Sequence, residues 1–386
     1  MPRPSRFWHP PLWKWLVFLA LLTASALLFP RKPPAIKVEL LPFSTSPPGW
    51  DGSYPYLVIS LDTPKPNQVR FTSSISYLRP TTRHDAPVNQ FQVDLHNGMF
   101  VLRQTDLFVA DIMPLALTRT YRPWDSHSRA FGAGANPYDI CPTGTRFPYT
   151  YENLNLEDGR AIYFPRISKG TGFADAVFRH EGTASEFYGA QDAWNGNGWT
   201  LKFQDGRQFI FPEAYFAKSY AQGAPTEMKD SAGNRIQLKR DKVRNLQQLI
   251  PPSGHKMTFR YDSSDRIIEA SDEAHVRRYT YDFGHLQTVS DDLSVLYRFD
   301  YEPLLHDRGY DPYLMTSIKD GSGRELLRNW YDRGGRVSKQ KLADGRVFQY
   351  DYLLDKKHNV TATTVILPGG KIETFQFNDG VPVLKK

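Results

Sequence analysis

The sequence contains one cysteine, Cys141, among its 386 residues. A single cysteine excludes a disulfide within the chain and a zinc site built on paired thiolates. No histidine or asparagine accompanies it in a protease-like pattern, so we interpret Cys141 as a small buried residue and not as a nucleophile. The sequence alone therefore offers no thiolate chemistry.

Amphipathic helical stripes are also missing after residue 88, where no stretch of 12 or more residues has apolar positions at helical spacing. Glycine and proline, 27 and 29 residues, are too few for a low-complexity chain. Aromatic residues reach 14%, mostly phenylalanine (24) and tyrosine (21). These two types favour half-buried sheet positions, so the composition predicts a mainly β protein.

Excess positive charge is confined to the N-terminus. The formal net charge is +7, but residues 1–37 hold six lysines and arginines and no acidic residue. The remainder is nearly neutral, with 42 basic and 41 acidic residues. A neutral body gives no basis for binding a phosphate backbone, so we expect no nucleic-acid partner.

The N-terminal segment 1–34 contains fifteen uncharged residues from Trp15 to Phe29. Extended back to Leu12, this run is long enough for a membrane-spanning helix. We expect a single-pass anchor with its N-terminus inside and the body exported, periplasmic or extracellular. A cleaved signal peptide is the alternative, since Ala24–Ala26 matches a small-x-small cleavage site, and a buried core helix is a third.

Residues 35–87 predict a proline-rich linker, with Pro33-Pro34 and Pro47-Pro48 near its start. Two short β-like runs, 56–62 and 69–78, lie within it. After residue 88, strands and turns alternate almost without pause. The recurring Asp-Gly-Arg turns, at 158–160, 205–207 and 344–346, predict type I′ hairpins.

Tyrosine–aspartate pairs recur through the C-terminal region with a period near 20 residues. The residues that define this repeat are Tyr261, Asp262, Tyr281, Asp282, Tyr331, Asp332, Tyr350 and Asp351. One hairpin cannot bury its aromatic face alone, whereas stacked hairpins can, by forming a continuous sheet. We expect each aspartate to accept backbone hydrogen bonds where its strand ends.

These repeats resemble the YD repeats of Rhs-type proteins, most clearly at 259–282 and 329–351. The stretches 91–107, 113–121 and 131–134 resemble the domain of unknown function that precedes such repeats. The resemblance covers about 88–386 and implies two regions, an Rhs-associated N-terminal-like β domain at 88–225 and a YD-repeat β region at 226–386. It implies stacked antiparallel hairpins in a curved or spiral sheet, which would follow the hydrophobic N-terminal helix.

Catalytic signatures are absent from the sequence. It has no nucleophile elbow, no His-Glu-x-x-His helix and no P-loop, so we expect no enzyme, no cofactor and no metal site. Carboxylates on distant strands could still meet, which a sequence cannot show. The histidines, among them His285, are scattered without ligand spacing, and we interpret them as turn or surface residues.

The best candidates for ligand binding are Trp194, Trp199 and Tyr188, because aromatic faces near amide side chains stack on sugars. The competing interpretation places both tryptophans in the core. We expect a non-enzymatic, membrane-anchored Rhs/YD-repeat envelope protein that contacts an envelope glycan or protein. The alternatives are a component or remnant of a contact-dependent Rhs toxin system, and a carbohydrate-binding or carbohydrate-active module.

Overall fold

The computed structural model describes the residues that follow: 54–65, 68–78, 89–123, 130–132, 134–157, 161–182, 185–214, 216–303, 313–378 and 381–383. All of them belong to one compact unit, Phe43–Lys386. The predicted anchor at 1–34 and residues 35–53 of the predicted linker lie outside the described residues, whereas Pro55 and Pro64 of that linker belong to a described strand, Tyr54–Lys65. Within the described ranges, no helix has the length and apolar character needed to span a membrane.

The first sheet has six described strands and includes both predicted runs of the 35–87 segment, which form a hairpin. Its spatial order is β2-β1-β3-β4-β5-β6, and every described pairing in it is antiparallel. The strands are β1 (Tyr54–Lys65), β2 (Gln68–Leu78), β3 (Asn89–Asp94), β4 (Phe100–Val109), β5 (Leu115–Tyr121) and β6 (Gly134–Ala135).

A second, three-stranded sheet follows, with the order β7-β8-β9. It comprises β7 (Cys141–Gly144), β8 (Tyr151–Asn155) and β9 (Ala161–Pro165). The described helices are short: a 3-10 turn, η1 (Pro137–Asp139), and α2 (Tyr220–Gly223). Cys141 is buried, in agreement with its predicted structural role.

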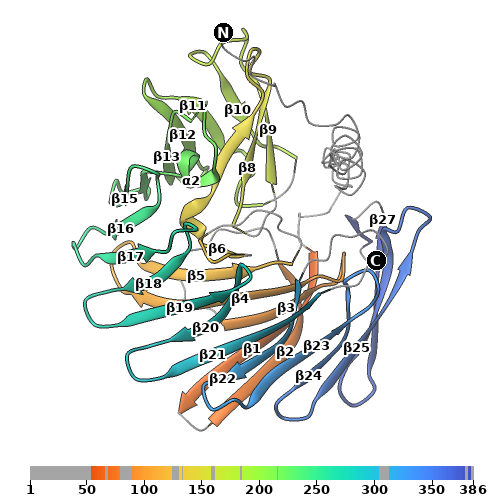
Figure 1. The fold of residues 1–386 in the computed structure, drawn as a ribbon. Coiled ribbons are helices and arrows are strands. Elements are labelled where there is room, and N and C mark those ends of the chain that lie inside the picture. Colours follow the sequence, from red (N-terminus) through yellow and green to blue (C-terminus); the bar gives the residue numbers. More distant parts are fainter. Residues whose placement is uncertain are drawn as a thin grey trace, which may run out of the picture. The chain divides into compact units, whose positions relative to one another are not determined.

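The rest of the chain forms a sheet in which nineteen described strands follow one another in chain order, all antiparallel (Figure 1). The mainly β prediction and the row of antiparallel hairpins are confirmed. The first strands are β10 (Val177–Arg179), β11 (Gln191–Trp194), β12 (Gly198–Lys202), β13 (Gln208–Pro212), β14 (Glu227–Lys229), β15 (Arg235–Arg240), β16 (Leu246–Ile250) and β17 (Met257–Tyr261). The sheet continues across the predicted boundary between residues 225 and 226, through the pairing of β13 with β14.

The later strands complete this long sheet and carry most of the repeats. They are β18 (Ile267–Ser271), β19 (Val276–Asp282), β20 (His285–Ser290), β21 (Val295–Pro303), β22 (Tyr313–Asp320), β23 (Glu325–Tyr331), β24 (Val337–Leu342), β25 (Val347–Leu354), β26 (Val360–Ile366), β27 (Ile372–Asn378) and β28 (Val381–Pro382).

A ladder of tyrosine hydroxyls connects successive repeats. Each ladder tyrosine donates to a carbonyl at or near the start of the second strand of the preceding repeat. These bonds join Tyr281 to Ile267 (2.7 Å), Tyr301 to Leu286 (2.9 Å), Tyr331 to Met315 (2.6 Å) and Tyr352 to Val337 (2.7 Å). In the last repeat Tyr352, and not the predicted Tyr350, makes this bond; Tyr350 donates to Gln340 instead.

The accepting carbonyls are available because a β-bulge recurs next to each of them, opposite the tyrosine of the same hairpin. Tyr261 pairs with Ile267 while its neighbour Arg260 pairs with Glu269, so one residue is skipped. The same shift occurs where Tyr331 pairs with Val337. A bulge turns backbone groups away from the ladder of strand hydrogen bonds, which frees them for other partners.

In two repeats the aspartate that follows the repeat tyrosine holds the turn, as predicted. The predicted Asp351 does not, because it lies within β25, and Asp355 accepts the turn amides of Lys357 and Asn359 instead. Asp262 Oδ1 accepts from the amides of Ser264 (2.9 Å) and Arg266 (3.0 Å). Asp332 accepts from Gly334 and Arg336 in the same way, at 2.8 and 2.9 Å. These bonds satisfy amides that the turn leaves without strand partners.

The predicted turn type is wrong at the described Asp-Gly-Arg sequences. In 205–207 and 344–346 only the glycine has a positive φ, +91° and +85°. A type I′ turn needs positive φ at two consecutive residues. Phe283 (φ 44°) and Gly284 (φ 83°) meet that condition instead. The third sequence, 158–160, lies outside the described residues.

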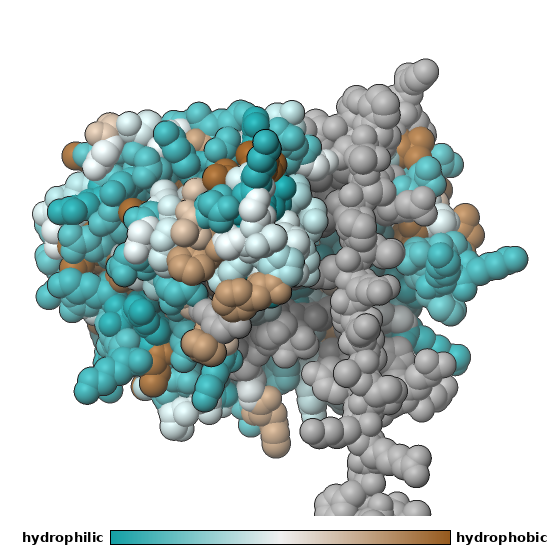
Figure 2. Space-filling view, turned by 90° about the horizontal axis from the view of Figure 1, so that it is seen from above, coloured by the Kyte–Doolittle hydropathy of each residue, from teal (hydrophilic) through white to brown (hydrophobic). Residues whose placement is uncertain are grey.

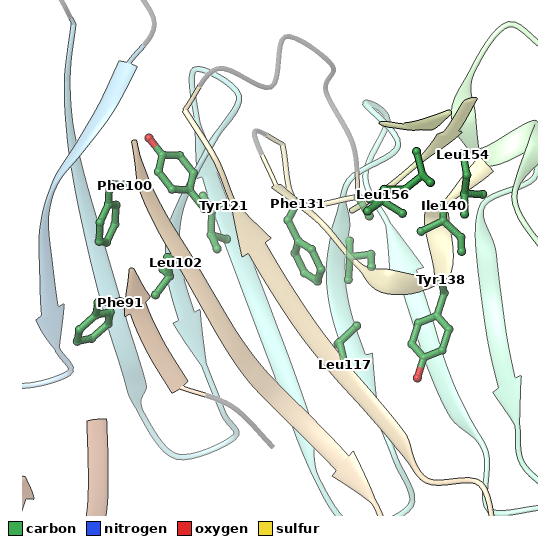
Figure 3. Packing of buried hydrophobic residues seen from close by; sticks show 14 of the residues in the cluster. Phe91, Phe100, Leu102, Leu117, Tyr121, Phe131, Tyr138, Ile140, Leu154 and Leu156 are labelled. Carbon is green, nitrogen blue, oxygen red and sulfur yellow. The ribbon is translucent and has the colours of Figure 1, made fainter. Parts of the chain in front are cut away.

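The buried apolar side chains form one cluster that extends from Leu57 to Phe377 (Figure 3). Side chains from the first sheet and from the repeats share it, so neither has a separate core. Phe131, for example, contacts Tyr279 edge to face, with 5.1 Å between ring centroids. Shared burial makes the two regions depend on each other for stability.

Three backbone amides of the repeats donate to the segment that precedes them. The amides of Ile267, Met315 and Val337 lie at or near the start of the second strand of a repeat. They donate to Ala130 O (2.7 Å), Tyr121 Oη (3.0 Å) and Gly98 O (2.9 Å). Gly98 has φ +75°, and a Cβ there would lie 2.6 Å from Arg336 Cβ. Only glycine allows this close approach.

A buried ion pair adds to this attachment. Arg119 Nε on β5 donates to Asp106 Oδ2 on β4 at 2.5 Å, and a second nitrogen donates to Gln104 Oε1 at 2.7 Å. Tyr279 of the repeats donates to the same carboxylate at 3.0 Å. The guanidinium lies over the ring of Phe299, 5.4 Å from its centroid. Every charged group here has a partner, as burial requires.

Candidate functional site at the irregular repeat

Two regular repeats share an arrangement of an aspartate, an arginine and the tyrosine of the following repeat. In the first, Arg266 Nε donates to Asp262 Oδ2 at 2.8 Å. The same guanidinium lies over Tyr281, with Cζ 4.6 Å from the ring centroid. A cation between a carboxylate and an aromatic face gains from both contacts. We call the space between aspartate and tyrosine the Asp–Tyr socket.

The second regular repeat builds the same socket. Arg336 Nε donates to Asp332 Oδ2 at 2.8 Å, and its Cζ lies 5.8 Å from the centroid of Tyr352. Burial raises the pKa of Tyr352 well above its usual value, so its hydroxyl stays protonated and donates in the ladder. In both repeats an arginine of the chain itself fills the socket.

The repeat that begins at Tyr281 departs from this pattern. Its turn is one residue shorter, because Tyr281 pairs with Leu286 whereas Tyr261 pairs with Ile267 six residues on. His285 occupies the position of the arginine. Its ring lies 5.0 Å from those of both Tyr301 and Tyr313. The socket therefore keeps its aspartate, Asp282, and its tyrosine, Tyr301, but none of the described residues places an arginine in it.

A pocket of about 190 Å³ opens at this repeat. Residues from β19, β20, β21, β22 and the Phe283 turn line it: Asp282, Phe283, His285, Gln287, Phe299, Asp300, Tyr301 and Tyr313. Most of these residues are polar or aromatic, and Phe283 at the rim is 85% exposed. The pocket thus combines carboxylates with aromatic faces.

The charges of the pocket are unevenly paired. Lys319 Nζ lies 2.6 Å from Asp300 Oδ2. Asp282 Oδ2 accepts a long hydrogen bond from Gln287 Nε2, at 3.4 Å. Desolvation lowers the pKa of His285 despite the opposing effect of Asp282, so the imidazole is neutral at pH 7. Its Nδ1 is buried without a hydrogen-bond partner in the described structure.

The sequence alone did not reveal this pocket, because His285 is one of several histidines scattered without ligand spacing. A position-by-position comparison of the repeats would have found it. Arg266 and Arg336 stand at equivalent positions, and His285 replaces them in a shortened turn. The useful signal was the departure from the repeat, and not the histidine itself.

Two of the predicted sugar-binding residues, Trp194 and Trp199, pair across β11 and β12, and Tyr188 precedes β11 in the chain. Trp199 is only 3% exposed, and its indole donates to Glu213 at 3.3 Å. Trp194 packs against it edge to face at 5.5 Å and is partly buried. Tyr188 is 48% exposed. Trp199 therefore presents no face to solvent, and sugar binding by this group stays a prediction.

Two carboxyl groups from different sheets meet in the interior. Glu152 of β8 and Asp192 of β11 are 4% and 1% exposed and share a side-chain hydrogen bond. Desolvation, reinforced by the neighbouring acid, raises the pKa of Glu152, and desolvation raises that of Asp192 to about 7. Asp192 Oδ1 has no hydrogen-bond partner in the part of the chain that the structure describes.

Within the described ranges, no group of three or more histidine, cysteine, aspartate or glutamate residues is arranged to hold a metal ion. The Glu152–Asp192 pair has two members and is buried.

A family described as "Domain of unknown function (DUF6531)" matches residues 91–141. This stretch contains all three segments for which the sequence analysis predicted a domain of unknown function before the repeats. It also supplies Gly98, Tyr121 and Ala130, which accept the repeat amides. The matched stretch thus includes three acceptors of repeat amides, while another contact with the repeats, Phe71 O accepting from Arg346, lies outside it.

Solved structures of Tc toxin components are similar to this chain at low sequence identity. A structure of the Photorhabdus luminescens Tc holotoxin pore covers 83% of this chain, with 12% identity and a TM-score of 0.30. The crystal structure of TcdB2-TccC3 also covers 83%, with 13% identity and a TM-score of 0.31. The chain spans about a fifth of the length of these proteins, 18% and 19%.

Proposed function

We propose that this chain is a non-enzymatic Rhs/YD-repeat protein of the cell envelope, tethered by its N-terminal segment, whose folded body serves as an interaction surface. The observation that carries the proposal is the repeat itself. In the regular repeats the aspartate and arginine are engaged in the socket, and the tyrosine of the next repeat donates to the ladder. Residues committed to such bonds support a rigid scaffold better than they support catalysis.

The outer surface agrees with an interaction role. Figure 2 shows a face on which hydrophilic residues predominate and hydrophobic residues are scattered in small groups. Scattered apolar residues are normal for a soluble surface and do not form a broad adhesive patch. Recognition on such a surface depends on local polar pockets, and the irregular repeat supplies one.

Cell fractionation tests the tether. Full-length protein with a C-terminal tag should sediment with membranes and resist extraction at alkaline pH. A variant with Leu19→Arg and Leu22→Arg, which breaks the apolar run, should appear in the soluble fraction. Loss of about 26 residues from the mature protein would indicate a cleaved signal peptide instead. Full-length wild-type protein in the soluble cytosol would contradict the proposal.

External protease tests the exposure of the body. In spheroplasts we expect the protease to digest the tagged body while a cytosolic marker survives. A protected body with an intact anchor would place the repeats inside the cell and contradict an envelope surface role. The two measurements together separate tethering from orientation.

A further inference from the structure

The regular repeats show what the Asp–Tyr socket is built to hold. In each of them a guanidinium lies between the aspartate and the next tyrosine. An Asp-Gly-Arg turn has the same arrangement of carboxylate, arginine and aromatic ring. There, Arg207 donates to Asp205 at 2.7 Å and lies over Phe203 at 4.7 Å. Each of these three turns thus places an arginine between a carboxylate and an aromatic face.

The socket at Asp282 and Tyr301 retains both faces but lacks the arginine. His285 covers part of Tyr301, yet about 190 Å³ stays open beside it. That space is several times the roughly 30 Å³ of one water molecule. Asp282 has only the 3.4 Å contact with Gln287, whereas Asp262 and Asp332 each bind a guanidinium at 2.8 Å.

We propose that this socket binds the guanidinium group of an arginine side chain supplied by a partner protein. Asp282 accepts its hydrogen bonds, and Tyr301, Tyr313 and Phe283 provide aromatic faces for its planar cation. Arginine fits better than lysine because guanidinium stacks on rings while donating in its own plane. The inference deepens the interaction role proposed above and rests on it for the existence of a partner.

The socket is open to a partner. Phe283 at the rim is 85% exposed, and the Asp300 side chain is 49% exposed. Because His285 is neutral at pH 7, it adds no repulsion toward an arriving cation. Protonation of the imidazole would add a positive charge beside the socket, so binding should weaken as the pH falls below the usual histidine range.

The direct test uses the full-length protein in detergent and the probe N-acetyl-arginine methylamide. Binding is followed by nuclear magnetic resonance of the tyrosine ring signals. We expect saturable binding in the millimolar range, as suits one side chain without its partner. The neutral isostere N-acetyl-citrulline methylamide should bind at least about tenfold more weakly, because it offers no cation.

Asp282→Asn should weaken binding of the arginine probe by about tenfold or more, since it removes the charge-assisted bonds. Asp351→Asn is the matched control, because it removes an exposed carboxylate from the same sheet and should leave binding unchanged. Equal affinity of the arginine probe for the Asp282→Asn variant and the wild type would overturn the proposal. So would the absence of binding to the wild type at tens of millimolar probe.

A second pair of variants tests whether the chain can fill the socket itself. His285→Arg restores the regular repeat and should abolish probe binding. Arg308→Ala removes an arginine between β21 and β22; wild-type affinity in this variant supports an external ligand. Binding that appears only after Arg308→Ala would assign the socket to the chain itself and overturn the proposal. Because purified protein is used, these outcomes are independent of the fractionation result.

Discussion

Two regions of the molecule bury carboxyl groups in opposite ways. On β4 and β5, Asp106 is paired with Arg119 at 2.5 Å and also accepts from Tyr279. Between β8 and β11, Glu152 and Asp192 are paired with each other. The first region neutralises its carboxylate with a fixed cation, and the second neutralises its carboxyls with bound protons.

This difference determines how each region responds to pH. The Arg119 guanidinium is charged throughout the physiological range, and its pKa is raised by Asp106 against the effect of burial. The protons of the acid pair are exchangeable. Arg146 is the cation that favours ionisation of Glu152, and it is outweighed by desolvation and by Asp192. Attachment of the 91–141 segment should therefore be insensitive to pH, and the acid pair should be sensitive.

The largest expected effect comes from breaking the cation-paired site. Arg119→Met keeps much of the side-chain volume but leaves Asp106 buried without its cation. We expect a loss of about 3–5 kcal/mol in the free energy of unfolding, because an uncompensated buried charge is costly. Urea denaturation followed by tryptophan fluorescence measures it.

The double variant Arg119→Met with Asp106→Leu is the control for that loss. Removing both charges avoids the unpaired carboxylate, so the double variant should recover a large part of the stability. If the double variant is as unstable as the single one, packing and not charge stabilises this region. The proposed difference between the cation-paired carboxylate and the acid pair would then be wrong.

Replacing one member of the acid pair should change the free energy of unfolding in the opposite direction, by stabilising the folded state. Asp192→Asn removes a buried ionisable group and keeps the volume. Because the pKa values of Glu152 and Asp192 are raised in the folded state, their contribution is complete below about pH 4 and declines toward pH 7. We expect the variant to exceed the wild type by on the order of 1–3 kcal/mol at pH 8 and by little at pH 4.

Unfolding measured at a series of pH values gives this difference directly. The exposed Glu273→Gln is the matched control, and it should follow the wild type within about 0.5 kcal/mol at each pH. A constant difference between Asp192→Asn and the wild type from pH 4 to 8 would show that the pair does not gain protons on folding.

The long sheet was predictable because its signals are local. The Tyr-Asp period, the Asp turns and the alternation of Phe348 with Gln349 follow from strand geometry and hydrogen-bonding needs within one hairpin. The tyrosine that joins the ladder in the last repeat was not predictable. Tyr350 and Tyr352 both fit the pattern, and only the position of the bulge decides which hydroxyl reaches the preceding repeat.

The candidate site was unpredictable for a different reason. The pocket depends on a turn that is one residue shorter than in the regular repeats and on His285 in place of an arginine. It also depends on the rings of Tyr301 and Tyr313, which come from the next two strands of the sheet. Likewise, Glu152 and Asp192 are forty residues apart in different sheets, and nothing local brings them together. Contacts between distant strands depend on register and stacking, which a single sequence does not encode visibly.

The smallest expected effect concerns the neutral hydroxyls of the ladder. Tyr331→Phe removes the 2.6 Å bond to Met315 O but no charge and little volume. We expect a loss of about 1 kcal/mol, the usual net value for one hydrogen bond, plus any cost of the unsatisfied carbonyl. Tyr188→Phe, at an exposed site, should change stability by less than about 0.5 kcal/mol. A loss near that for Arg119→Met would mean that the ladder, and not buried charge, dominates the attachment of the first sheet, since Met315 also donates to Tyr121.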